Sequence, residues 1–319
     1  MLDESGVASL ASIVGDENVL ADADSLDRYT GDSLSPSRAF GAAAAFERLA
    51  DVVVRPGCTS EVAEVVRWAN EHQIPIVPYG GGTGVMGAVV PERGGIVLDV
   101  KRMNRVLEID PESLTARVDA GVVLEELETV LAEHGLMIGH DPYSVPIATV
   151  AGTISTNGVG YRACAHGPMG DQLVGLEAVL PDGRIIETRD VPKYSSGPNL
   201  NHLFIGAEGT FGVITRATIR IYRVPESAQF ASVGFDTFDE GFAAATEMLA
   251  LGIRPSLLDL TEEDEEVTLH LLFEGFTEGV APRRSGRQQS VTQRVAIPLE
   301  QSPLNTTGQF GATQRKATS

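Results

Sequence analysis

Residues 75–88 read PIVPYGGGTGVMGA, a short apolar run that leads directly into three consecutive glycines, followed by Gly84 and Gly87. A glycine run after a strand leaves main-chain N–H groups unshielded by Cβ atoms, so several of them can converge on one anion. No Lys or Arg lies in this stretch. An anion bound here must therefore be held by main-chain donors.

The loop also matches the dinucleotide-binding pattern G-x-G-x-x-G at 82–87, with Asp99 at about the distance of a ribose-binding acid. That pattern requires a helix to open at the loop, yet Pro91, Gly94 and Gly95 follow before two helical turns can form. The sequence therefore argues against a Rossmann fold. Two interpretations stay open, a glycine-rich turn without a ligand and a phosphate-binding loop, and the consecutive glycines favour the second.

Composition and charge narrow the classes of partner. The 319 residues carry a formal net charge of −20, which repels nucleic-acid phosphates and anionic lipid, so we expect small-molecule or protein partners. Cys58 and Cys164 are far apart and the six histidines lack metal-ligand spacing, so neither a disulfide framework nor a metal site is predicted. An acidic N-terminus and the lack of a long apolar run predict a cytoplasmic protein without a membrane span.

Hydrophobic periodicity predicts an α+β chain rather than a regular βαβ repeat. Strands and hairpins are expected at 51–57, 74–80, 94–100, 105–120, 173–188 and 212–224. Amphipathic helices are expected at 59–73 and 124–135. Thr59 or Ser60 is predicted to cap the first helix, and Gly135 to end the second.

Three segments together carry a family resemblance: PIVPYGGGTG, ATVAGTISTNGVGY at 148–161 and IGAEGTFGVIT at 205–215. In order and content they resemble the flavin-contacting segments of the FAD-binding domain of the vanillyl-alcohol oxidase family, also called the PCMH-type domain. The resemblance implies two α+β subdomains with FAD extended between them, followed by an α/β cap domain over the flavin ring. The implied organisation is an N-terminal segment, the PCMH-type domain, the start of the cap and a tail, at 1–45, 46–226, 227–280 and 281–319.

The cap region and the tail differ in character. Residues 229–253 read as a strand and then a helix, and residues 266–277 as a further strand. The acidic run TEEDEE at 261–266 is predicted to be a solvated loop. Residues 281–319 hold six basic residues and one acidic residue without periodicity, which predicts disorder or out-of-frame translation.

The resemblance implies a role for each matching position. The glycine loop would hold the FAD pyrophosphate through Pro78, Gly80, Gly81, Gly82, Thr83, Gly84 and Val85. The second segment would lie near the flavin and supply main-chain and hydroxyl donors, through Pro142, Ser144, Thr149, Gly152, Thr153, Ser155 and Thr156. Contacts along the ribityl chain would come from Asn157, Gly158, Gly160 and Tyr161. The third segment would contribute Glu208 and Gly209, and would meet the adenine side through the backbone of Val213 and Ile214.

Individual residues refine these expectations. Branches of the family that attach FAD covalently through this loop carry histidine where this chain has Thr83, so the resemblance implies non-covalent FAD. Glu208 is expected to be buried, where a carboxylate without a partner is unfavourable, and this favours a functional role. His140 falls near the flavin and is a candidate catalytic residue, and a loop histidine hydrogen-bonded to the backbone is the alternative.

The resemblance implies that the cofactor supplies the chemistry. Members similar to D-lactate dehydrogenase and the glycolate oxidase flavoprotein subunit oxidise a small 2-hydroxy acid by hydride transfer to flavin and need an electron acceptor. Ser196-Gly197-Pro198 resembles alkylglycerone-phosphate synthase instead, but Thr153 stands where that enzyme has Trp and Leu258 where it has an arginine for a substrate phosphate. A non-catalytic flavin-binding fragment is the third hypothesis. A homo-oligomer and a partner subunit both stay open.

Overall fold

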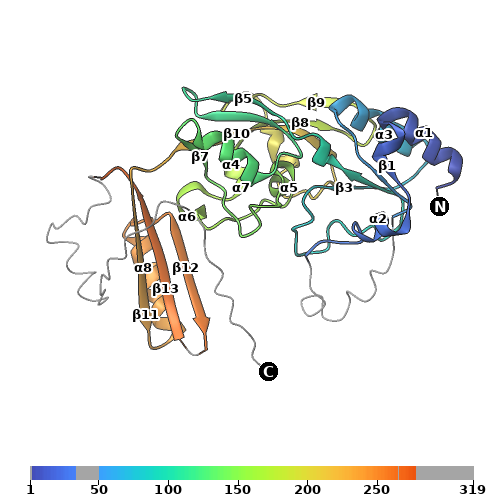
Figure 1. The fold of residues 1–319 in the computed structure, drawn as a ribbon. Helices are drawn as coiled ribbons and strands as arrows, with labels where there is room; N and C mark the ends of the chain where they lie inside the picture. The colour runs from blue at the N-terminus through green and yellow to red at the C-terminus, as the bar shows by residue number, and fades with distance from the viewer. Residues whose placement is uncertain (1, 34–49, 265, 278–319) are drawn as a thin grey trace.

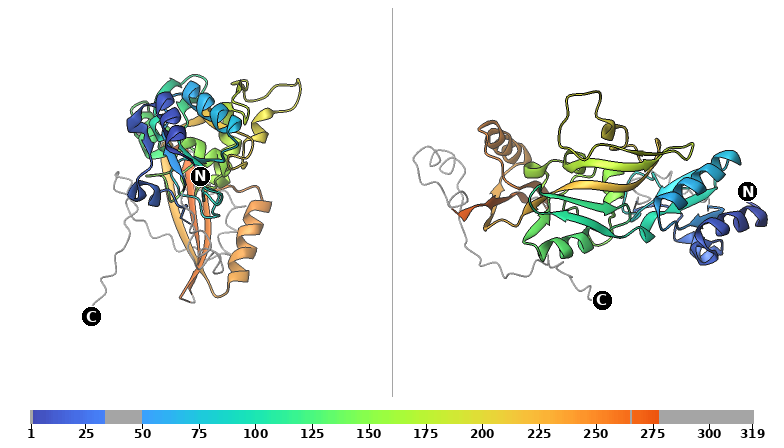
Figure 2. Two further views of the ribbon diagram at one scale, coloured as in Figure 1. Left: turned by 90° about the vertical axis from the view of Figure 1, so that its right-hand side faces the viewer. Right: turned by 90° about the horizontal axis from the view of Figure 1, so that it is seen from above.

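The computed structural model describes residues 2–33, 50–264 and 266–277, and in them the chain forms three separate β-sheets with helices packed on them (Figure 1). The expected α+β class is therefore confirmed. Two of the sheets lie side by side in the larger part of the molecule, and the third projects from one end (Figures 1 and 2).

The first sheet has the strand order β1-β2-β4-β3. Strands β2 (Val52–Val54), β4 (Ile96–Asp99) and β3 (Ile76–Tyr79) are parallel, and β1 (Val19–Leu20) joins β2 in the antiparallel sense. Every residue of β2 and β4 is buried, as expected for parallel strands covered on both faces. The carboxyl ends of β3 and β4 point to the same edge of the sheet, and the glycine loop leaves from that edge.

Helix α3 (Thr59–Glu71) follows β2 as predicted, but the expected cap is wrong. The N-cap residue is Cys58, whose side chain makes no capping hydrogen bond. Glu61 stabilises the turn instead, since its carboxylate accepts the Gly57 N–H at 2.7 Å. The Thr59 hydroxyl is already inside the helix and donates to Glu177 at 2.6 Å, so tertiary contact determined where the helix begins.

The second sheet is antiparallel, with the order β5-β6-β10-β8-β9. Its strands are β5 (Val106–Asp110), β6 (Thr115–Asp119), β10 (Val213–Arg223), β8 (Leu173–Val179) and β9 (Ile185–Glu187), and β7 (Leu136–Ile138) pairs with the end of β10. Both predicted hairpins are therefore confirmed. Helices α3 and α5 (Val150–Ser155) contact β10, so one apolar core is continuous between the two sheets.

The remaining elements lie before the first strand or between strands. They are α1 (Glu4–Val14), η1 (Asp16–Asn18), α2 (Ala23–Asp27), η3 (Val100–Arg102), α4 (Leu124–Ala132), α6 (Ala163–His166), α7 (Met169–Gln172) and η4 (Leu200–Leu203). Helix α4 ends close to the predicted Gly135, which has φ +68°. No helix in the described part of the chain combines the length and the apolar character of a bilayer span.

A buried ion network ties three strands of the second sheet together. Asp119 on β6 is fully buried and accepts hydrogen bonds from Arg105 at 2.8 Å and from Arg216 on β10 at 3.2 Å. Arg216 also donates to Glu177 on β8 at 3.2 Å. Glu177 in turn accepts the Thr59 hydroxyl, so the network reaches from the second sheet to the first residue of α3. Every charge in the network therefore has an opposite partner.

The third sheet has the order β11-β13-β12 and carries helix α8 (Phe238–Ala250) on one face. The predicted strand, helix and strand are confirmed as β11 (Ser227–Phe235), α8 and β13 (Glu266–Gly275), and β12 (Leu257–Glu263) is an additional strand. The acidic run is therefore not a simple loop, because it closes the β12–β13 hairpin with Asp264 at φ +51°. Glu262, Glu263, Asp264 and Glu266 are exposed to solvent at the end of this hairpin.

Arg162 joins the third sheet to the larger part of the molecule. Its guanidinium donates to Glu274 on β13 at 3.0 Å and to Asp141 at 3.0 Å, and the Arg162 N–H donates to the same Asp141 carboxylate at 2.7 Å. The predicted domain limits at 45/46 and the predicted tail at 281–319 fall outside the described residues. The limit at 226/227 coincides with the start of β11 and stays a prediction.

The buried network generates a stability prediction. Substituting Arg216→Gln removes one of the two cations that compensate the buried Asp119 carboxylate, and we expect a loss of roughly 2–3 kcal/mol in the free energy of unfolding. Arg220→Gln is the matched control, because Arg220 lies on the same strand and is exposed. Urea unfolding monitored by circular dichroism checks this, and equal stability of the two variants would contradict the assigned role of Arg216.

Candidate functional site

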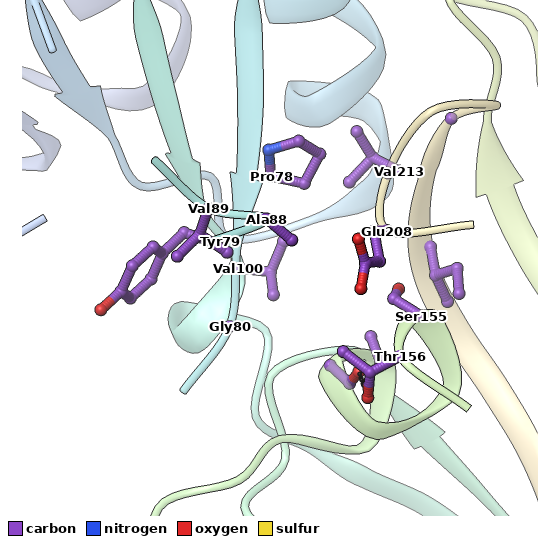
Figure 3. A pocket seen from close by; sticks show the side chains of 15 residues that line it. Pro78, Tyr79, Gly80, Ala88, Val89, Val100, Ser155, Thr156, Glu208 and Val213 are labelled. Atoms are coloured by element: carbon purple, nitrogen blue, oxygen red, sulfur yellow. Dashed lines mark hydrogen bonds between the residues drawn. The ribbon is translucent and has the colours of Figure 1, made fainter. Parts of the chain in front are cut away.

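A shallow cleft lies between the first and second sheets, and its space of about 540 Å³ includes part of the surrounding solvent. Figure 3 shows the side chains that line it, with the ends of β3 and β4 on one side and the start of β10 and the end of α5 on the other. The lining residues are Pro78, Tyr79, Gly80, Ala88, Val89, Val100, Ala151, Gly152, Ser155, Thr156, Glu208, Gly209, Gly212, Val213 and Ile214.

The position of the cleft follows from the topology of the first sheet. In open sheets with parallel strands, ligands bind outside the carboxyl ends of the strands. Pro78 and Tyr79 end β3, and Val100 directly follows β4. The cleft therefore lies where backbone direction alone predicts a ligand, although the rest of the fold is not a Rossmann fold.

The glycine loop is pressed against the chain that precedes α5. A Cβ placed on Gly80 would lie 2.4 Å from the Thr149 hydroxyl oxygen, and one on Gly81 would lie 2.3 Å from the Ile147 carbonyl oxygen. No side chain fits at such distances. The expectation that these two glycines exist to admit a phosphate is therefore incomplete, because contact within the protein already requires them.

Gly82 is constrained in another way. Its φ of +64° lies in the left-handed region, and a Cβ there would stand 2.1 Å from the Tyr79 hydroxyl oxygen. A Gly82 substitution would therefore disturb the loop whether or not a ligand binds. The loop nevertheless keeps the donor set of an anion site. These residues lie outside the strands, and no hydrogen bond between described residues uses the main-chain N–H of Gly81, Gly82, Thr83 or Gly84.

The second segment forms the short helix α5, which the sequence did not predict. Thr149 is its N-cap, is buried, and accepts the Gly152 N–H at 3.3 Å. The expectation that Thr153 supplies a hydroxyl donor to a ligand is wrong, because Thr153 is buried and its hydroxyl donates to the Val150 carbonyl at 2.9 Å. Ser155 and Thr156 do line the cleft, at the end of the helix.

Glu208 corrects a second expectation, because it is exposed rather than buried. The burial penalty therefore gives no argument for its function. What the structure shows instead is a non-glycine residue at φ +48°, whose N–H donates to the Ser155 carbonyl at 3.0 Å and whose carboxylate points into the cleft beside Ser155 (Figure 3). Among the described residues that line the cleft, it is the only charged side chain and none carries a positive charge.

The other predicted contacts lie on the loops beyond the lining. Asn157 has φ +48° and its side-chain oxygen accepts the Gly170 N–H at 3.0 Å, so it shapes the turn after α5. Gly160 lies against Asp141, where a Cβ would meet the Asp141 nitrogen at 2.6 Å. Predicted residues outside the cleft lining are Gly81, Gly82, Thr83, Gly84, Val85, Pro142, Ser144, Thr149, Thr153, Asn157, Gly158, Gly160 and Tyr161.

His140 is buried with 2% of its surface exposed, and neither ring nitrogen has a hydrogen-bond partner. The alternative of a histidine bonded to the backbone is therefore not seen. Burial lowers the pKa of His140 from 6.5 to about 4, which keeps the imidazole neutral at pH 7. The ring packs against Gly158, and its nitrogens do not reach the solvent. A catalytic role would require the surrounding loop to move.

Comparison with known proteins identifies the domain that builds this cleft. Residues 50–189 match the family described as the FAD binding domain, which spans β2 to the end of the β8–β9 hairpin. The chain carries a FAD-binding domain. The expected resemblance to PCMH-type flavoproteins is confirmed, and FAD is its cofactor.

The relatives that share this FAD-binding domain are named as different enzymes. The chain is 35% identical over 219 residues to glycolate oxidase subunit GlcD of Bacillus subtilis, covering 68% of this chain and 47% of that protein. It is 39% identical to D-lactate dehydrogenase of Archaeoglobus fulgidus, covering 74% and 52%. It is 36% identical to alkyldihydroxyacetonephosphate synthase of Caenorhabditis elegans, covering 69% and 38%. The chain therefore spans about half, or less, of the length of these relatives.

Solved structures support the fold. An alkyldihydroxyacetonephosphate synthase superposes with a TM-score of 0.80 over 93% of this chain and 62% of its own, at 24% identity. A p-cresol methylhydroxylase superposes with a TM-score of 0.75 over 91% of this chain and 64% of its own, at 21% identity. These likenesses extend past the FAD-binding domain into the third sheet, because they cover nine-tenths of the chain.

Two features of the cleft and of the adjoining glycine loop are compatible with the ADP half of FAD. The pyrophosphate is an anion, and the glycine loop offers main-chain N–H groups that lack partners within the described residues. The apolar side chains of Pro78, Val89 and Val213 provide surfaces for a planar ring. Sequence reasoning missed Tyr79, Ala88, Val89, Val100, Ala151 and Gly212 as lining residues, although Tyr79 lies inside the quoted loop motif.

The buried His140 generates a pH prediction for the FAD-free protein. Because its folded-state pKa lies below its unfolded value, the unfolded chain binds the extra proton, and stability falls as the pH drops from about 6.5 to about 4. We expect wild type to lose about 3 kcal/mol more than His140→Leu across this window. Urea unfolding at several pH values checks this, with exposed His134→Leu as the control. Parallel pH profiles for wild type and His140→Leu would contradict it.

Proposed function

We propose that the protein binds FAD non-covalently in this cleft and is an oxidoreductase that oxidises a small 2-hydroxy acid. The observation that carries the FAD site is the glycine loop next to the cleft. Among the described residues, the N–H groups of Gly81–Gly84 have no hydrogen-bond partner and no cation lines the cleft. Main-chain donors provide the binding that Lys or Arg would otherwise supply, and they add no charge to a protein of net charge −20.

The lining residues have distinct roles in this proposal. The N–H groups of Gly81–Gly84 bind the pyrophosphate oxygens. The Glu208 carboxylate would repel phosphate, so it belongs on the nucleoside side, where it can accept hydrogen bonds from ribose hydroxyls or the adenine amino group. Val213 and Ile214 are buried in β10 and offer backbone and apolar contact to adenine. FAD, when bound, supplies the hydride-accepting ring for oxidation of the substrate carbon.

Thr83 supports non-covalent attachment. Its hydroxyl is a weak nucleophile without a neighbouring base to activate it among the described side-chain hydrogen bonds, whereas the branches that link FAD at this position use histidine. The remaining predicted contacts, including Pro142, Ser144 and Tyr161, lie on the loops next to α5 and are proposed to contact the flavin half of the cofactor.

The substrate class rests on the third sheet, because sequence identity to the 2-hydroxy-acid enzymes and to the synthase is nearly equal. Leu258 packs against α8, so its side chain lies on the covered face of the sheet and cannot contact a substrate on the other face. Asp259 alternates with it and lies on the open face. A carboxylate repels a substrate phosphate, and this argues against the acyl-glycerone-phosphate substrate of a synthase.

The mode of attachment gives the first test of this function. We expect FAD-loaded protein, precipitated with acid and centrifuged, to release its flavin into the supernatant. The absorbance of the supernatant at the flavin band, compared with total flavin before precipitation, measures this release. Flavin that stays with the pellet after washing in denaturant would overturn the non-covalent assignment.

The reaction gives the second test. Anaerobic mixing of the FAD-loaded chain with D-lactate or glycolate should bleach the flavin slowly. We expect the rate of bleaching to be roughly 10²–10⁴-fold below that of an enzyme with a positioned base, because His140 is buried. With a dye as electron acceptor, a 2-oxo acid should accumulate and is trapped as its hydrazone. Bleaching by an acyl-glycerone phosphate without any 2-oxo acid from the hydroxy acids would support the synthase alternative. No bleaching by any of them would support a non-catalytic flavin-binding protein.

A further inference from the structure

The N-terminal segment touches the glycine loop directly. We define residues 29–33 as the strap. The Asp32 carboxylate accepts the Gly87 N–H at 2.9 Å, the Ser33 N–H donates to the Gly84 carbonyl at 2.8 Å, and the Ser33 hydroxyl lies 3.4 Å from the Gly82 carbonyl. The strap therefore contacts both halves of the glycine loop, although some fifty residues separate the strap from the loop in the sequence.

The strap is itself anchored at the edge of the first sheet. The Tyr29 hydroxyl donates to the buried Asp99 carboxylate at 2.7 Å, at the end of β4. The Tyr29 ring meets the Tyr79 ring edge to face at 4.8 Å, at the end of β3. Lys101 pairs with Asp99 at 3.5 Å and lies over both rings. Asp99, a ribose-binding acid in the rejected Rossmann interpretation, is instead the anchor of the strap.

We propose that Asp32 is a positioning residue for FAD: it holds the glycine loop so that the N–H groups of Gly81–Gly84 face the pyrophosphate. The Asp32 carboxylate accepts the Gly87 N–H, and the Ser33 N–H donates to the Gly84 carbonyl. These two hydrogen bonds fix the outer side of the loop. The inner N–H groups are then turned toward the cleft. This inference rests on the proposed binding of pyrophosphate at the glycine loop.

The charge of Asp32 allows a specific test of the proposal. Together with burial and Asp99, Asp32 raises the pKa of Tyr79, so its negative charge is felt at the base of the loop. That charge opposes a bound pyrophosphate, whereas the hydrogen bond to Gly87 favours the binding conformation. A residue with the same shape and an acceptor oxygen but no charge should therefore bind FAD at least as well as Asp32.

The first experiment compares Asp32→Ala, Asp32→Asn and the control Asp24→Ala, an exposed acid in α2 on the same segment. Flavin fluorescence titration measures the FAD dissociation constant, and competition by ADP tests the pyrophosphate half alone. We expect Asp32→Ala to weaken FAD and ADP binding by the same factor, about 3–10-fold for one lost hydrogen bond. Asp32→Asn should bind like wild type or tighter, and Asp24→Ala like wild type. Asp32→Ala with wild-type affinity, or Asp32→Asn as weak as Asp32→Ala, would overturn the proposal.

A second measurement separates the strap from the FAD site. Hydrogen exchange of the FAD-free protein reads the loop without ligand, and peptides covering residues 80–88 should exchange faster in Asp32→Ala than in Asp32→Asn or Asp24→Ala. If wild type binds no FAD while this exchange pattern holds, the proposed binding site is wrong and the strap is right. Unchanged exchange in Asp32→Ala overturns the strap itself.

A double-mutant cycle tests the contact between the strap and Gly84. A Cβ on Gly84 would lie 3.0 Å from the Asp32 carboxylate oxygen, and Gly84 does not have a positive φ. Gly84→Ala should therefore weaken FAD binding by displacing Asp32, and should weaken it less in the Asp32→Ala background, where that oxygen is gone. Additive effects of the two substitutions would contradict direct contact between the strap and the loop.

Discussion

The close approach of Gly80 and Gly81 to residues 147–149 is the contact on which the cleft depends. It brings the carboxyl edge of the parallel sheet against the chain that enters α5, at distances that exclude any Cβ atom. Gly209 repeats the arrangement on the far side of the cleft, where a Cβ would lie 2.8 Å from Pro78. Without these approaches the two sheets would stand apart by at least the width of a side chain. The cleft would then be too wide for one cofactor to contact both walls.

Two regions of the molecule differ in how they use charge. Within the second sheet, Asp119, Arg216 and Glu177 pair across strands, so buried charges are compensated in place. Around the cleft, the proposed binding comes from dipoles of the main chain, and Glu208 is the only charged residue type among the described lining residues. A loop of backbone donors binds a pyrophosphate without placing cations in a strongly acidic protein. The donors hold their direction only if the loop is rigid, which gives contacts such as that of Asp32 their importance.

Under the proposed function, the third sheet would contact the substrate. Arg162 couples Glu274 on β13 to Asp141, the residue that follows the buried His140, so the sheet is tied to the loop expected beside the flavin ring. Its open face presents Asp259, with His270 beside it on β13, and the Ser232 hydroxyl lies 2.9 Å from the His270 ring nitrogen.

The sequence by itself determined the α+β class, the strands at 51–57 and 74–80 and both hairpins, because periodicity and turn residues act over a few neighbouring positions. It did not determine that α3 begins at Thr59 without a hydroxyl cap, that α5 is a helix, or that Thr153 faces inward. Those outcomes depend on partners distant in sequence, such as Glu177 for Thr59. The tertiary structure alone decided that Glu208 is exposed in the cleft, that His140 is buried without partners, and that Asp32 lies against Gly87. Burial and long-range hydrogen bonds are properties of the assembled fold, and no local pattern encodes them.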